Sequence, residues 1–500
     1  MRLVAAAAIP APVLPVAPNE APAQFSPGPM ADFAEGQLVA SKAMRGAAFL
    51  AARYGLGVLV SLGNMLVMTW WIGPHAYGLF VTAAGLITFL GTLGRMGVDV
   101  YLIRCEITPD ARAYGVATGI ILTISTMLAM GGVALVPLLA RWFGNQEFVA
   151  PYLALLLTIP ITALTGVPTA KLERALNYSG LAGVELGGQC LGLLVALAAA
   201  WHRLGVWAPV AGYASWQAFI LVGTYRAARL HPRVDWGAPM ARAMLAYGIG
   251  LTASLRAWQM RTLVNPLLVG RFAGAEGVAF VGLAIRIAES LGTVRNAAGR
   301  LAIAALARLR NHHEDFHSTL ERALRLQILT LGPPLCGFAL LGPFAICHII
   351  GERWMPSLTV YPFIAAGVLA NSVYNLQASA LFVLGKQWMV LRAYSVHLAL
   401  LGAGTFFLLP HFGLAGYGWA ELLACGGYWG IHAGLGHFVI LSYRRLLPWL
   451  GIFCALLFVP LVNSARMRPS LSATHPAQAA HRLVVWNGKT AVPTKHARTR

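Results

Sequence analysis

The residues with the clearest chemical potential are arginines inside long apolar stretches. An arginine near the centre of a bilayer costs about 2.5–3.5 kcal/mol on insertion scales, so it should face protein or a water-filled cavity. Its planar guanidinium matches the oxygens of a phosphate or diphosphate. We therefore predict a positive cavity that holds an anionic group. The predicted binding residues are Arg53, Arg95, Arg261, Arg286, Arg295 and Arg300, with the amides of Asn64, Asn265 and Asn296.

Two simpler explanations compete with such a cavity. Ion pairs between helices would account for some of the arginines. Arg53, Arg295 and Arg300 could instead lie near helix ends, where long side chains reach the membrane interface. The apolar stretches also hold carboxylates, and a buried carboxylate can couple proton exchange to a conformational switch or simply pair with a base. The candidates for coupling are Asp99, Glu185, Glu289 and Glu421.

The composition places these residues in a membrane protein. The chain has 500 residues, of which 58% are hydrophobic and 11% charged, with a mean hydropathy of +0.66. Soluble domains carry about 25% charged residues. The net charge of +20 comes mostly from basic residues at the ends of apolar segments, which indicates membrane orientation and argues against a nucleic-acid partner. The sequence has no CxxC, HExxH, GxxxxGKS/T or GxSxG motif, so we expect no cofactor, no metal and no enzyme activity.

Twelve segments are long and apolar enough to span a bilayer, which takes about 20 residues. They lie at 47–72, 76–104, 113–140, 148–170, 177–201, 206–227, 244–270, 275–307, 326–350, 356–384, 388–410 and 413–442. A shorter run at 449–462 could be a further span. With the N-terminus in the cytoplasm, the opposite side receives only Arg141, Arg203, Arg271 and Arg353. This bias predicts a multi-pass protein of a bacterial inner membrane with a cytoplasmic N-terminus.

The domain organisation follows from these segments. We predict a disordered Ala/Pro-rich cytoplasmic tail at 1–44, a six-helix bundle at 45–232 and a second one at 233–445. A short apolar segment at 446–463 and a disordered basic tail at 464–500 complete the chain. The charged segment 309–325 contains His312, His313, Glu314 and Asp315, but it lacks a metal-ligand spacing and is interpreted as a solvated helix face.

The stretch Leu62–Arg104 is repeated 201 residues later. Leu62, Asn64 and Gly73 match Leu263, Asn265 and Gly274. A polar stripe is repeated in register, with Thr88, Thr92, Arg95 and Asp99 matched by Glu289, Thr293, Asn296 and Arg300. Steps of four, three and four residues place each stripe on one face of a helix. The repeat predicts two similar walls around one cavity, with Asp99 in the slot that Arg300 fills.

Four motifs resemble the polysaccharide flippase branch of the multidrug/oligosaccharidyl-lipid/polysaccharide exporter superfamily. They are IGPHAYGLFVTAAGLITFLGTLGRMGVDVYLIR at 72–104, VGRFAGAEGVAFVGLAIRI at 269–287, GVWAPVAGY at 205–213 and GLAGYGWAE at 413–421. The resemblance covers about residues 45 to 445. It implies an all-α fold of about twelve transmembrane helices, in two six-helix bundles related by a pseudo-twofold axis. It departs from the family at Asn265, where relatives often carry an acidic residue.

The resemblance also implies a function. Such proteins flip undecaprenyl-diphosphate-linked oligosaccharide units from the cytoplasmic to the periplasmic leaflet by alternating access, for O-antigen or exopolysaccharide synthesis. Implied partners are this lipid, membrane lipids, and a polysaccharide polymerase and chain-length regulator. Three alternatives remain: flipping lipid II or another lipid-linked precursor, exporting a drug or metabolite, and acting as a membrane polymerase or ligase. The last would need a sizeable periplasmic loop, which the sequence does not show.

Overall fold

A computed structural model describes residues 29–105, 108–292, 313–439, 441–444 and 446–472. The chain separates into two compact units, Met1–Leu56 and Gly57–Arg500. The packing described below lies within the second unit. The predicted binding residue Arg53 falls in the first unit, where side chains are not described, and Arg295, Asn296 and Arg300 lie outside the described residues.

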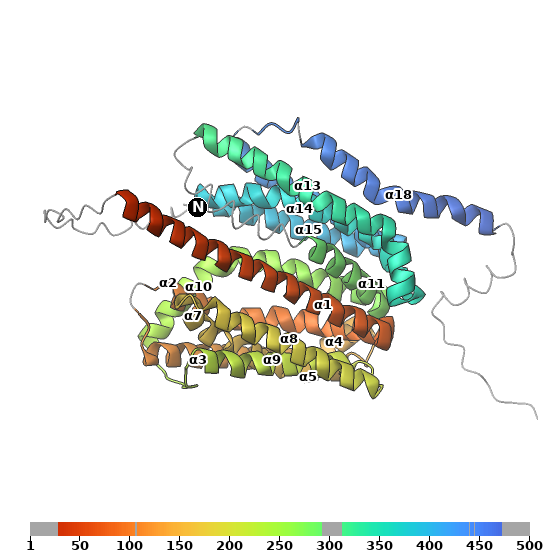
Figure 1. Cartoon of the computed structure of the whole chain (residues 1–500). Helices are drawn as coiled ribbons and strands as arrows, with labels where there is room; N and C mark the ends of the chain where they lie inside the picture. The colour runs from red at the N-terminus through yellow and green to blue at the C-terminus, as the bar shows by residue number, and fades with distance from the viewer. Residues whose placement is uncertain (1–28, 106–107, 293–312, 440, 445, 473–500) are drawn as a thin grey trace, which may run out of the picture. The chain divides into compact units, whose positions relative to one another are not determined.

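The first half of the chain is helical from Pro29 (Figure 1). Its helices are α1 (Pro29–Gly94), α2 (Val98–Arg104), α3 (Ala111–Ala134), α4 (Val136–Phe143), α5 (Val149–Leu156), α6 (Thr158–Leu164), α7 (Gly166–Arg174), α8 (Tyr178–Trp201) and α9 (Trp207–Ala227). Helix α1 begins inside the segment 1–44 that was predicted as a tail. Helices α8 and α9 run side by side, because Gly192 on α8 and Gly212 on α9 let the two backbones touch.

The second half repeats this pattern with more irregular turns. Its elements are α10 (Ala238–Gln259), the 3₁₀ turn η1 (Met260–Leu263), the π-helical turn η2 (Asn265–Val269), α11 (Gly270–Leu291), α13 (His313–Ala345), the π-helical turn η3 (Ile346–Ile350), the 3₁₀ turn η4 (Glu352–Trp354), α14 (Ser357–Val383), α15 (Gln387–Phe412), α16 (Leu414–Cys425), the 3₁₀ turn η5 (Gly426–Tyr428), α17 (Trp429–Gly436) and α18 (Leu447–Ser472). Helix α14 is the most deeply buried, and α13 and α18 pack along each other (Figure 1).

Eight helical segments among the described residues are long and apolar enough to cross a membrane. They are Met68–Gly94, Ala111–Ala134, Val149–Arg174, Tyr178–Trp201, Met260–Leu291, Phe316–Ile350, Ser357–Val383 and Gln387–Phe412. The other predicted spans correspond to the first part of α1, to α9, to α10 and to the broken helix α16–α17. The additional apolar run forms a shorter helix at Leu447–Leu461. The chain is therefore an all-α, multi-pass membrane protein, as predicted.

Two glycines show that the predicted repeat exists in three dimensions. Gly73 breaks α1 with φ 77° and ψ 170°, and Gly274 breaks α11 with φ 67° and ψ −172°. A positive φ with extended ψ is open to glycine at little cost. The two breaks lie 201 residues apart, so each half has the same sharp hairpin between its first two long helices. We refer to the membrane side of these breaks as the hairpin side.

The prediction of one continuous helix over 76–104 is wrong. Helix α1 ends at Gly94, and α2 begins at Val98 after a turn in which Met96 and Gly97 have φ of 43° and 73°. A Cβ on Gly97 would lie 2.7 Å from Cα of Gly248 on α10. The break lets these two backbones meet. Consequently Thr88, Thr92, Arg95 and Asp99 do not share one uninterrupted helix face.

Candidate functional site

An ion pair buried in the second half is the most prominent charged feature of the described residues. Arg261 lies in η1, and its Nη2 donates a short hydrogen bond to Oε1 of Glu421 on α16. The Glu421 side chain is 2% exposed and the Arg261 side chain 22%. Glu421 Oε2 is also buried and has no hydrogen-bond partner among the described residues. The acid is therefore enclosed, while the arginine side chain is partly exposed.

Aromatic and amide groups surround this ion pair. His397 on α15 donates from Nδ1 to the Ala424 carbonyl at 2.8 Å and stacks on the Tyr428 ring at 4.5 Å. The Tyr428 hydroxyl accepts a hydrogen bond from Asn371 Nδ2 on α14 at 2.9 Å. Glu289 lies within electrostatic range of Arg261. We did not predict His397 or Tyr428, and Tyr428 is one more aromatic in an apolar stretch, which gave no signal.

A second charged cluster lies in the first half. Arg95 Nη2 donates to the Thr162 carbonyl at 3.1 Å and to Thr165 Oγ1 at 2.9 Å. Its Nη1 lies 3.7 Å from Asp99 Oδ2. Glu173 lies close enough to Arg95, Asp99 and Glu185 for electrostatic interaction. The structure thus brings two coupling candidates, Asp99 and Glu185, into the surroundings of one predicted binding arginine, and adds Glu173, which sequence reasoning missed.

The exposed charges on α11 lie next to the contact between the two halves. Val81 of α1 touches Gly282 of α11, and these two residues are equivalent in the 201-residue repeat. About one and two helical turns further from the hairpin breaks, respectively, Arg286 and Glu289 are exposed on α11. Thr88, the repeat equivalent of Glu289, is exposed on α1. Helices α1 and α11 therefore meet at the pseudo-twofold axis. Both carry exposed polar residues on the side of this contact that faces away from the hairpin breaks.

The two predicted asparagines lie deeper in the packing. Asn265 Nδ2 donates to the Val278 carbonyl at 3.4 Å and packs against Gly282, so it helps to hold α11 against η2. Asn64 Oδ1 is buried in α1.

The predicted binding arginines do not form one cluster. Arg95 and Arg261 have carboxylate partners in separate halves, and Arg286 is exposed on α11.

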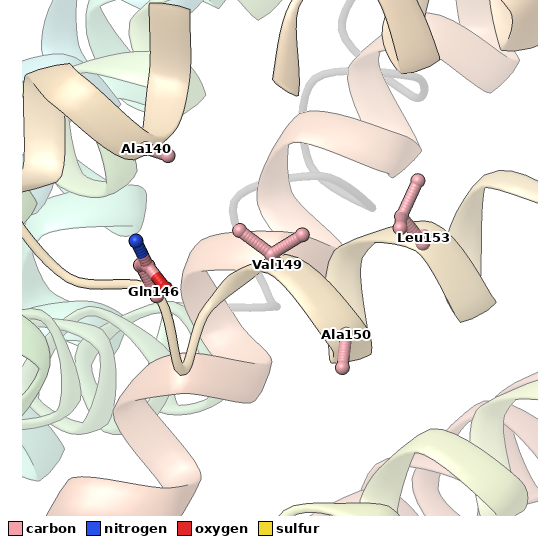
Figure 2. A pocket seen from close by; sticks show the side chains of 5 residues that line it. All are labelled: Ala140, Gln146, Val149, Ala150 and Leu153. Atoms are coloured by element: carbon pink, nitrogen blue, oxygen red, sulfur yellow. The ribbon is translucent and has the colours of Figure 1, made fainter. Parts of the chain in front are cut away.

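The described part of the molecule contains two hollows. An open hollow of about 460 Å³ lies at the corner between α4 and α5, and Figure 2 shows its lining by Ala140, Gln146, Val149, Ala150 and Leu153. Its one polar side chain, Gln146, gives it little means to select a ligand. A second hollow of about 190 Å³ lies between α1, α11, α13 and η3 and is lined mainly by apolar residues that include Met65, Ile287 and Phe338. In the described part of the chain, no group of three or more His, Cys, Asp or Glu residues could hold a metal ion.

Comparisons with known proteins agree with this architecture. The chain is 22% identical over 314 residues to the succinoglycan biosynthesis transport protein ExoT of Rhizobium meliloti (strain 1021). That alignment spans 62% of this chain and 62% of the length of the curated relative. A solved structure of the lipid II flippase MurJ in an inward closed conformation superimposes with a TM-score of 0.68 at 12% identity, covering 83% of this chain and 93% of that chain. An inward-facing multidrug transporter of the MATE family superimposes with a TM-score of 0.56 at 17% identity, covering 80% and 95%.

The two solved structures therefore show a shared fold, which is that of the lipid II flippase MurJ and of a multidrug transporter of the MATE family. Residues 67–359 match the family described as polysaccharide biosynthesis protein, and the chain belongs to that family. The shared fold agrees with the two-halved helical architecture derived above.

Proposed function

We propose that this protein flips an undecaprenyl-diphosphate-linked oligosaccharide from the cytoplasmic to the periplasmic leaflet by alternating access, in exopolysaccharide or O-antigen synthesis. The observation that carries the proposal is Arg286. It is exposed on a membrane-spanning helix, about one turn beyond the Val81–Gly282 contact between the halves. An arginine at that depth needs polar surroundings, which polar protein groups, water and a polar ligand can provide. The space beside α11 then suits an anionic headgroup.

The rest of the site provides complementary features. Arg261, whose side chain is partly exposed, is a second positive charge in the same half. The apolar hollow between α1, α11 and α13 offers a place for part of an isoprenoid chain, because hydrocarbon buried there leaves no polar group unsatisfied. Arg95, with Asp99, Glu173 and Glu185 around it, is assigned to conformational coupling within the first half. The similarity to ExoT supports an exopolysaccharide over an O-antigen pathway.

Deleting the gene tests this function. Lipid-linked repeat units should accumulate on the cytoplasmic leaflet, and polysaccharide at the cell surface should disappear. Wild-type protein should restore export, whereas Arg286→Gln should not. If lipid II accumulates in the deletion strain instead, the substrate is the peptidoglycan precursor and the oligosaccharide assignment is wrong.

A further inference from the structure

Two tryptophans cross between the halves at the hairpin side. Trp142, in α4 of the first half, donates from Nε1 to the Leu267 carbonyl in the second half at 2.9 Å. Trp354, in η4 of the second half, donates from Nε1 to the Thr69 carbonyl in the first half at 3.0 Å. Each half therefore sends one indole N–H to the backbone of the other half. We call Trp142 and Trp354 the indole clasps.

The two clasps are related by the internal repeat. Both belong to an Arg-Trp pair, Arg141–Trp142 and Arg353–Trp354, which lie 212 residues apart. This spacing exceeds the 201-residue offset by 11 residues. Both acceptor carbonyls precede the glycine break of their half, with Thr69 four residues before Gly73 and Leu267 seven residues before Gly274.

Helix irregularities lie close to both acceptor carbonyls. Pro74 has no N–H, so the Trp70 carbonyl four residues earlier loses its normal helical donor. A guanidinium nitrogen of Arg353 donates to that carbonyl, beside the bond from Trp354 to Thr69. In the other half, Leu267 lies in the π-helical turn η2, where the regular bond pattern is also broken. Arg353 thus binds the carbonyl that Pro74 leaves without its helical donor, next to the Trp354 bond, and Trp142 binds a carbonyl inside a π-helical turn.

Packing around the clasps is unequal. Trp354 is completely buried and packs edge-on against Tyr77 at 5.7 Å and Phe280 at 6.0 Å. Trp142 is 37% exposed, and the Arg271 guanidinium lies over its ring at 5.7 Å. Opening the hairpin side must break both bonds and uncover Trp354, whereas Trp142 is already part-solvated.

We propose that the indole clasps are a two-part gate that holds the hairpin side closed and sets the balance between the two access states. This rests on the proposed function only in so far as it assumes alternating access. A net hydrogen bond of ordinary strength shifts an equilibrium about fivefold, so losing both should favour the open hairpin side about 25-fold.

A cysteine accessibility experiment tests the gate. The six native cysteines are replaced and Val81→Cys, at the contact with Gly282, serves as reporter in cells and in inverted vesicles. A membrane-impermeant maleimide supplied at the hairpin side should label the Trp142→Phe, Trp354→Phe double variant about 25-fold faster than the parent. Trp142→Phe alone should label about fivefold faster. The control is Trp201→Phe, an exposed residue of α8 that packs against Trp71 on the same side.

The outcomes separate the gate from the transport function. Labelling of the double variant at the control rate, with normal insertion, would refute the gate. If the buried Trp354→Phe change prevents insertion, the half-exposed Trp142→Phe variant decides, and an unchanged rate overturns the proposal. The labelling assay needs no substrate. A parent that shows the predicted labelling but never restores polysaccharide export would therefore reject the proposed function and leave the gate standing.

Discussion

Substitutions in the ion pair between Arg261 and Glu421 can distinguish a role in stability from a role in transport. Removing one partner leaves an uncompensated charge in a buried site, which typically costs about 3–5 kcal/mol. The Arg261 side chain is 22% exposed, so water relieves part of this cost and we expect about 3 kcal/mol for Glu421→Leu. Replacing both partners by apolar residues of similar volume is often neutral. The Arg261→Met, Glu421→Leu double variant should therefore regain nearly wild-type stability.

In these variants of Arg261 and Glu421, we expect export to stay low even where stability is restored. If the partly exposed Arg261 side chain binds the headgroup, the double variant stays inactive although it is stable. The assay combines thermal unfolding in detergent with surface polysaccharide in the deletion strain, for the wild type, both single variants and the double variant. Full export by the stable double variant would show that Arg261 only balances Glu421, and would remove it from the binding site.

Three further predictions concern other parts of the molecule. Arg286→Gln should lower export about tenfold or more, because a hydrogen bond to a charged group contributes about 1.5–3 kcal/mol, while thermal stability stays unchanged; unchanged export would contradict its role. Gly78→Val should destabilise the protein by about 1–3 kcal/mol in thermal unfolding, since a Cβ would lie 1.8 Å from the Ala275 carbonyl oxygen; a neutral variant would contradict this contact. The hydrogen bond from His75 lowers the pKa of Glu147 below its usual 4.5, so the pair stabilises the protein above that pH and loses this effect as pH falls through the lowered pKa. The stability difference between wild type and Glu147→Gln should therefore vanish in acid, and a difference that persists there would refute the assignment.

The repeat and the hairpins could be predicted because they are local patterns. Gly73 and Gly274 are visible in the sequence at one offset, and each has the positive φ that such a turn needs. The break at Gly97 could not be predicted, because it depends on the approach of Gly248 from a distant helix. A sequence pattern of apolar and polar residues does not record which helices meet.

The candidate site was likewise predictable from the sequence only in its local features. Arginines in apolar segments stand out in the sequence, but the partner of each arginine is fixed by tertiary packing. Arg261 pairs with Glu421 across 160 residues, whereas Arg95 bonds to the backbone of α6 and leaves its own helix face. Glu173 was missed because it lies at the end of a predicted span, where an acidic residue is unremarkable. Packing alone distinguishes a buried pair from an exposed charge such as Arg286.

The most direct test of the central claim is translocation in proteoliposomes that contain purified protein and a fluorescent undecaprenyl-diphosphate-linked oligosaccharide. Movement between leaflets is measured by the loss of fluorescence to an external quencher. The account predicts protein-dependent movement by the wild type, at least about tenfold slower movement by Arg286→Gln, and competition by undecaprenyl diphosphate without sugar. Absence of movement by the folded wild type, or wild-type rates for Arg286→Gln, would contradict a diphosphate-binding cavity between the two halves.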